Sequence, residues 1–189
     1  MDPRAPLVLD TRELGRRAGS EREVRRSVPA PAGLGIEVLS VPEGTPVELD
    51  LRLEAVLEGV LVTGTVSAGL AGECVRCLDE LSDIVETTFQ ELYVYDDAAH
   101  DDPDADEESD VRRLEDDLVD LEPVLRDSVV LALPFQPLCS QDCPGLCPEC
   151  GAHLADDPEH SHEAPIDPRW AGLAALQEDE STVQHDPES

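Results

Sequence analysis

The stretch VELDLRLEAVLEGVLVTGTVSAGLAGEC, residues 47–74, decides the fold. From 47 to 57 every odd position is apolar and most even positions are charged, a period of two that predicts a half-buried β-strand. Glu58 and Gly59 predict a turn, after which small and apolar residues continue on the even positions to Cys74. The stretch therefore predicts a β-hairpin, and the glycines in its second strand suggest a curled sheet.

Further elements are expected on both sides of this hairpin. A short strand is expected at 7–9, and the Arg-rich stretch 11–28 is expected to be helical. A third long strand is expected at 82–95, where the alternation slips near Glu91 and suggests a β-bulge. The hairpin turn between the second and third strands then carries the CxxC pair of Cys74 and Cys77.

The second half of the chain predicts one helix. Residues 118–121 are expected to form a strand, and apolar residues at helical spacing follow Pro123 until Pro134 ends the helix. The fold class is therefore α+β: a curled antiparallel sheet, a packed helix and a C-terminal zinc-knuckle segment. The expected organisation is a strand and Arg-rich segment (1–30), an antiparallel sheet with the CxxC tip (31–95), an acidic flexible insertion (96–117), a strand and core helix (118–136), a Cys-rich zinc segment (137–154), and a polar tail (155–189) with a short helix at 167–177.

The charge limits the choice of partners. The 189 residues carry a formal net charge of -31, which repels phosphate backbones and argues against a broad electrostatic grip on nucleic acid. A basic protein is the better electrostatic match. A local Arg cluster leaves room for weak contact with RNA or a partner, through Arg12, Arg16, Arg17, Arg25 and Arg26, although a solvated face is the simpler interpretation.

The sequence predicts a cytoplasmic protein. The N-terminus has no apolar run of signal-peptide length, and no stretch approaches the length of a membrane span. In the cytoplasm, six Cys argue for metal or redox chemistry over structural disulfides.

The segment PLCSQDCPGLCPECG, residues 137–151, predicts a structural Zn²⁺ site. Thiolates are preferred ligands of Zn²⁺, four of them complete a tetrahedral shell, and a short loop brings them together at little entropic cost. The favoured ligand set is Cys139, Cys143, Cys147 and Cys150. In an alternative set, arranged in the manner of a zinc ribbon, Cys74 and Cys77 replace the first two; two-centre and disulfide arrangements are also open.

A thiol-based redox protein or sensor that uses the CxxC pairs is the chemical rival. A thioredoxin-type site needs a CxxC that opens a helix, with a lowered thiol pKa. Here the first CxxC lies between antiparallel strands, among the acidic residues Glu73, Asp79 and Glu80. The sequence offers no nucleophile triad or phosphate-binding loop, so we expect that the protein is not an enzyme.

Five segments together resemble the YceD family, the large ribosomal RNA subunit accumulation proteins, in the form found in Gram-positive and actinobacterial species. They are LVLDTRELG (7–15), CVRCL (74–78), LVDLEPVLRDSVVLALPFQPLC (118–139), CSQDCPGLCPECGAHL (139–154) and DPRWAGLAAL (167–176). The resemblance implies a role in the synthesis, processing or stability of large-subunit rRNA during ribosome assembly, and implies no reaction. It also implies a ribosomal protein or pre-ribosomal particle as partner. We expect neither a membrane nor a small-molecule substrate.

Overall fold

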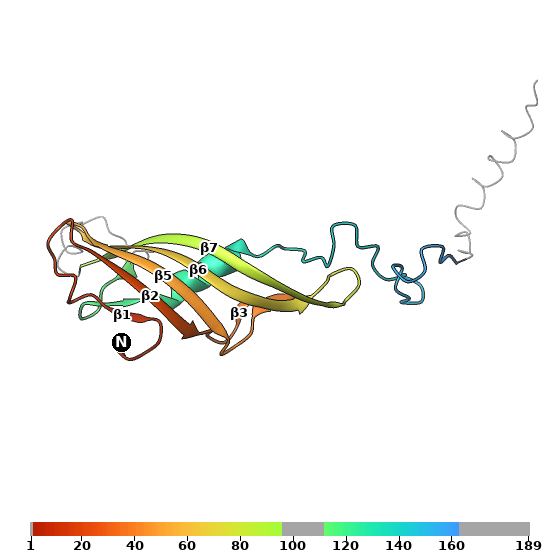
Figure 1. Ribbon diagram of the computed structural model, residues 1–189, viewed down its shortest axis with the longest axis horizontal. Helices are drawn as coiled ribbons and strands as arrows, with labels where there is room; N and C mark the ends of the chain where they lie inside the picture. The colour runs from red at the N-terminus through yellow and green to blue at the C-terminus, as the bar shows by residue number, and fades with distance from the viewer. Residues whose placement is uncertain (1, 96–111, 163–189) are drawn as a thin grey trace, which may run out of the picture. The chain divides into compact units, whose positions relative to one another are not determined.

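The computed structural model describes residues 2–95 and 112–162. The chain divides after Gly145 into two compact units, Met1–Gly145 and Leu146–Ser189. All the strands and the helix of the described residues lie in the first unit (Figure 1): β1 (Val8–Asp10), β2 (Glu21–Pro29), β3 (Leu34–Ile36), β4 (Leu39–Val41), β5 (Pro46–Ala55), β6 (Gly59–Glu73), β7 (Glu80–Val94), β8 (Arg112–Arg113), β9 (Leu118–Asp120) and α1 (Glu122–Ala132).

Residues 2–95 and 112–162 form mostly antiparallel β-sheet with one short helix. Seven strands form an open sheet whose main path runs β2-β5-β6-β4-β3. The long strand β6 is central because residues 60–68 pair with β5, residues 71–72 pair with β4, and the full strand pairs with β7. The short β8 adds to β7 in parallel, and β1 and β9 form a separate two-stranded sheet.

The predicted hairpin of residues 47–74 is confirmed as β5 and β6. Their register runs without interruption from Val47↔Ala68 to Ala55↔Val60. The odd positions of β5 are buried and the even positions are exposed or half-buried, as the period of two requires. These inward side chains share one buried cluster with Val124, Leu125 and Val129 of α1. In Figure 1 the helix (teal) lies behind the sheet, where it contacts β7 and β3.

The bounds of α1 follow from its sequence. The side chain of Asp120 accepts a 2.9 Å hydrogen bond from the backbone N–H of Glu122, and Pro123 occupies the first turn, where a missing N–H costs nothing. Pro134 follows the last helical residues and prevents continuation. The chain leaving α1 then runs toward the segment that carries Cys139 and Cys143.

The expected bulge near Glu91 is wrong, because β6 and β7 pair in continuous register from Gly59↔Val94 to Glu73↔Glu80. Glu91 lies at the same register parity as the buried Phe89 and Tyr93, so it is a charged residue at an inward position. The guanidinium of Arg112 lies 3.6 Å from its carboxylate. A partnered charge facing inward interrupts the apolar pattern without interrupting the strand.

The expected helix at 11–28 is also wrong, because residues 21–29 form the edge strand β2. Arg22 and Arg26 pair with Leu53 and Leu49 of β5, so both point to the inner face. Their guanidinium groups donate hydrogen bonds to backbone carbonyls of β1, at 3.3 Å to Asp10 and 3.1 Å to Val8. The alternation of apolar and polar residues is not visible in β2, because two of its inward positions are arginines. Arginine is tolerated there because its aliphatic part can pack on the sheet while its guanidinium group is hydrogen-bonded to β1.

Two expectations fall outside the described residues. The helix expected at 167–177 lies there, as does the acidic insertion except for residues 112–117. Across 2–95 and 112–162, none of the helical structure has the length and apolar character that crossing a membrane requires.

Candidate metal centre

Four cysteines converge at the tip of the β6–β7 hairpin. Cys74 and Cys77 lie in the turn between the two strands, and the segment after α1 brings Cys139 and Cys143 to them. Two hydrogen bonds hold this arrangement: the backbone N–H of Val75 donates to the carbonyl of Pro137 at 3.0 Å, and Arg76 donates to the carbonyl of Cys143 at 2.9 Å. We call these four cysteines the thiol cluster.

The thiol cluster has the dimensions of a tetrahedral metal site. All four sulfur atoms lie within 4.8 Å of one another. Cys74 Sγ lies 3.8 Å from Cys143 Sγ, and Cys77 Sγ lies 3.6 Å from Cys139 Sγ. Four sulfurs at the usual zinc–thiolate distance of about 2.3 Å form a tetrahedron with edges of about 3.8 Å. Cys74, Cys77 and Cys143 are buried, so the cluster is mostly closed to solvent.

Backbone amides favour a thiolate at the first cysteine of the CxxC pair. The N–H groups of Cys77, Cys139 and Arg76 lower the pKa of Cys74 to about 6. The other thiols are held protonated when no cation is near. The Cys143 thiol raises the pKa of Cys139, and burial raises the pKa of Cys143. Because four adjacent thiolates repel one another, only a cation at their centre lets all four ionise.

A second group of metal-ligating side chains lies in the second unit. Cys147, Cys150, His160 and His162 place one sulfur or ring nitrogen each within 4.8 Å of one another. Cys147 is buried, His160 is half-buried, and Cys150 and His162 are exposed. We call this group the mixed cluster.

The two CxxC pairs fold in the same way. The residue after each pair has a positive φ, 64° at Leu78 and 73° at Gly151. The N–H of that residue donates a 2.8 Å hydrogen bond to the carbonyl of the first cysteine, Cys74 or Cys147. Amides of Cys150 and Glu149 lower the pKa of Cys147 to about 6, as happens at Cys74. Each pair therefore forms a knuckle that turns amide N–H groups toward a sulfur.

The structure groups the predicted ligands differently from either set that the sequence favoured. Cys139 and Cys143 join Cys74 and Cys77, whereas Cys147 and Cys150 join two histidines. The grouping follows the two-centre arrangement that the sequence left open. The sequence predicted that the loop 137–151 binds one ion with its own four cysteines. In the structure, the β6–β7 hairpin places Cys74 and Cys77 next to Cys139 and Cys143, which follow α1.

Sequence reasoning missed His160 and His162 as members of a cluster. They lie two residues apart in a polar stretch, ten and twelve residues after Cys150. Their spacing was the available signal, since an HxH pair ten residues after a CxxC pair can complete a four-ligand shell.

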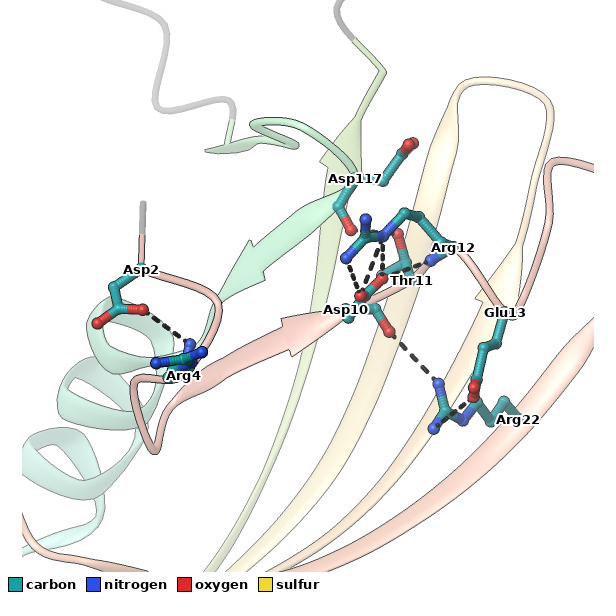
Figure 2. A network of polar contacts seen from close by, with 8 residues as sticks. All are labelled: Asp2, Arg4, Asp10, Thr11, Arg12, Glu13, Arg22 and Asp117. Atoms are coloured by element: carbon teal, nitrogen blue, oxygen red, sulfur yellow. Dashed lines mark hydrogen bonds and ion pairs between the residues drawn. The ribbon is translucent and has the colours of Figure 1, made fainter.

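The arginines expected to contact RNA or a partner are mostly engaged within the chain. Figure 2 shows Arg12 against Asp10, and Arg22 between Glu13 and the backbone of Asp10. The five arginines lie as follows: Arg12 pairs with Asp10, Arg16 with Asp117 at 3.3 Å while it stacks over the Tyr95 ring, Arg25 with Asp50 at 3.0 Å, Arg26 binds the carbonyl of Val8, and Arg17 is exposed.

An open antiparallel sheet whose hairpin tip completes a four-thiol cluster defines a small β-protein with candidate metal sites. The family model described as "Large ribosomal RNA subunit accumulation protein YceD" matches residues 62–177, and the chain belongs to this family. The matched residues include both clusters and exclude β1 to β5.

Relatives extend the match to the N-terminal part of the chain. An uncharacterized protein of Mycobacterium tuberculosis is 47% identical over 172 residues, which cover 91% of this chain and 82% of the relative. A Mycobacterium leprae protein is 43% identical over the same length. YlbN of Bacillus subtilis is 29% identical over 140 residues, 72% of this chain and 78% of YlbN. No solved structure matches the chain.

Proposed function

We propose that this protein is a non-enzymatic cytoplasmic factor that supports the accumulation, processing or stability of large-subunit rRNA during ribosome assembly, and that the thiol cluster holds a structural Zn²⁺. The observation that carries the proposal is that the family-matched residues 62–177 contain the whole thiol cluster. The family description provides the link to large-subunit rRNA. A metal ion bound in the thiol cluster would stabilise the fold of the matched region.

The choice of zinc rests on ligand chemistry. Four thiolates in a tetrahedron suit Zn²⁺ or an iron centre, and a closed shell without an open position is typical of a structural rather than a catalytic zinc site. A bound ion would link the β6–β7 tip to the chain after α1. The segment from Pro134 to Gly145 has no helix or strand of its own, so its shape depends on such links.

A basic ribosomal protein or a pre-ribosomal particle is the partner that the charge supports. The net charge of -31 opposes association with bare RNA, and intramolecular carboxylates already neutralise Arg12, Arg16 and Arg25. Direct RNA contact is therefore the weaker version of the proposal. Affinity purification after ribonuclease treatment separates the two versions: retained ribosomal proteins support protein contact, and loss of every ribosomal partner contradicts it.

Depletion of the protein tests the role itself. We expect the ratio of mature large-subunit to small-subunit rRNA to fall several-fold, with recovery by the wild-type gene. A Cys74→Ser, Cys77→Ser double variant should fail to restore the ratio, whereas Val75→Ala, in the same turn, should restore it. An unchanged rRNA ratio after full depletion would contradict the proposal.

The lowered pKa of Cys74 is the observation that favours the redox alternative. The same thiolate is also what a metal ligand requires, so the pKa does not separate the two functions. Thiol titration before and after chelation does. If the thiols become reactive only as the metal is released, the site is structural. If the untreated protein rapidly forms and reduces disulfides, the redox function is supported.

A further inference from the structure

We infer that Cys147, Cys150, His160 and His162 form a second, independent site for a divalent ion of the zinc class, and that this ion folds residues 146–162. The inference stands apart from the rRNA role, because it concerns metal content and local folding only. Four observations carry it: the convergence of lone pairs, the carboxylates behind the histidines, the shared knuckle geometry and the lack of a core in this segment.

Three ligand atoms of the mixed cluster form a closed triangle. His160 Nε2 lies 2.9 Å from His162 Nε2 and 3.2 Å from Cys150 Sγ, and His162 Nε2 lies 3.3 Å from the same sulfur. A neutral imidazole Nε2 either carries a proton or offers a lone pair. All three contacts of the triangle can therefore be hydrogen bonds only if one lone pair accepts two of them. A cation at the centre satisfies all three atoms. In a tetrahedral zinc site the corresponding edges are about 3.4 to 3.6 Å, a few tenths of an ångström longer.

The far side of each imidazole faces a carboxylate. His162 Nδ1 lies 3.5 Å from Glu149 Oε2, and His160 Nδ1 lies 3.9 Å from Asp157 Oδ2. A carboxylate at Nδ1 favours the proton on that nitrogen and leaves the Nε2 lone pair directed at the cluster. Carboxylates behind the ligating histidines of zinc sites act in this way.

The knuckle of Cys147 and Cys150 supplies the other half of the shell. Its turn is closed by the N–H of Gly151 on the carbonyl of Cys147, and the N–H of Cys147 donates to the carbonyl of Ala152, both at 2.8 Å. The same first hydrogen bond and the same positive φ occur in the knuckle of the thiol cluster. The ligands of the two sites do not overlap, so each site can fill separately.

Residues 146–162 have little secondary structure and no hydrophobic core to stabilise their fold. Within this range there is no helix or strand, only turns and an isolated bridge between Leu146 and His153. Cys147 is the single buried side chain in the range. A segment of this length cannot bury enough apolar surface to fold unaided, and a metal ion is the usual substitute for a core.

Metal analysis of the full-length protein, purified without chelator, tests the inference. We expect about two divalent ions per chain, and about one after His160→Asn or His162→Asn. His153→Asn is the matched control, because it removes a histidine of the same segment that lies outside the cluster, and it should keep both ions. A wild-type content of one ion that both cluster variants retain would overturn the inference.

Two further measurements apply if a variant binds metal poorly for other reasons. In the cobalt-loaded protein, His160→Asn should remove the d–d bands of a mixed sulfur–nitrogen site and leave those of the four-thiolate site. Amide hydrogen exchange over residues 146–162 should rise to that of an unfolded chain in His160→Asn, with exchange in β5 and β6 unchanged. Protection of 146–162 that is the same with and without metal would contradict metal-dependent folding.

Discussion

The backbone N–H of Val75, at the tip of the β6–β7 hairpin, donates a 3.0 Å hydrogen bond to the carbonyl oxygen of Pro137, 62 residues later in the chain. Pro137 lies two residues before Cys139, and Val75 lies between Cys74 and Cys77. This bond joins two cysteine-bearing segments, whose four cysteines make up the thiol cluster.

Each cysteine variant should lose the metal ion of its own cluster and keep the ion of the other cluster. Cys74→Ser and Cys139→Ser should each remove the same metal ion, and the double variant should lose no more than either single variant, because one site is already broken. Cys150→Ser should leave that ion in place. The measurement is metal content per chain, together with the urea midpoint of the sheet. Retention of full metal content by Cys74→Ser would contradict the thiol cluster as a site.

Gly72 should not accept a side chain. A Cβ at this position would clash with the carbonyl oxygen of Val38 and lie 2.9 Å from Leu39 Cα, so β4 would have to move away from β6. We expect Gly72→Ala to lower the free energy of unfolding by about 1–3 kcal/mol in urea denaturation. Gly69→Ala is the control on the same strand, since its Cβ meets nothing within 4 Å. Equal stabilities of the two variants would refute the close approach of β4.

We expect the hydrogen bonds of Arg126 to stabilise the fold. Its guanidinium donates to the carbonyls of Gly33 and Ala32 and to the carboxylate of Glu122 at 3.0 Å, which ties α1 to the loop before β3. Arg126→Ala should cost about 1–3 kcal/mol of stability, because charged donors make the stronger hydrogen bonds.

Arg126→Lys provides the matched control for charge. It keeps the positive charge and loses the planar fork, so we expect it to recover less than half of the lost stability. Full recovery by lysine would show that charge alone matters at this position. Thermal or urea unfolding of both variants gives the comparison.

The Asp10 carboxylate should titrate at unusually low pH. Hydrogen bonds from the side chain and backbone of Arg12 lower its pKa from 3.8 to about 2 (Figure 2). Since the folded pKa lies below the unfolded one, the pair stabilises the fold above about pH 4, and this stabilisation disappears as the pH falls toward 2. The carboxyl carbon shift of Asp10 in an NMR titration reports the pKa directly. In Arg12→Ala the pKa should move part of the way back toward 3.8, because the backbone N–H at position 12 still donates to Asp10; an unchanged low pKa would exclude the Arg12 side chain as a cause.

The sequence determined the strands and the helix whose residues obey a simple period. In β5 the apolar residues alternate without exception from Val47 to Ala55, so burial of one face settles both the strand and its register. Pro123 and Pro134 settle the extent of α1 equally well, because proline favours the start of a helix and prevents its continuation. The sequence also identified cysteines as the candidate ligands, since thiol chemistry is a property of the residue itself.

Only the tertiary structure decided which ligands meet. Arg22 and Arg26 face inward where a helix was expected, and Glu91 faces inward where a bulge was expected, because their charged ends find partners on other elements. Cys139 lies with Cys77 rather than with its neighbour Cys147 for a related reason: the return path of the chain after α1 is set by hydrogen bonds at the hairpin tip. Loop length measures the entropic cost of a local site, but it carries no information on where the rest of the fold places a second pair of thiols.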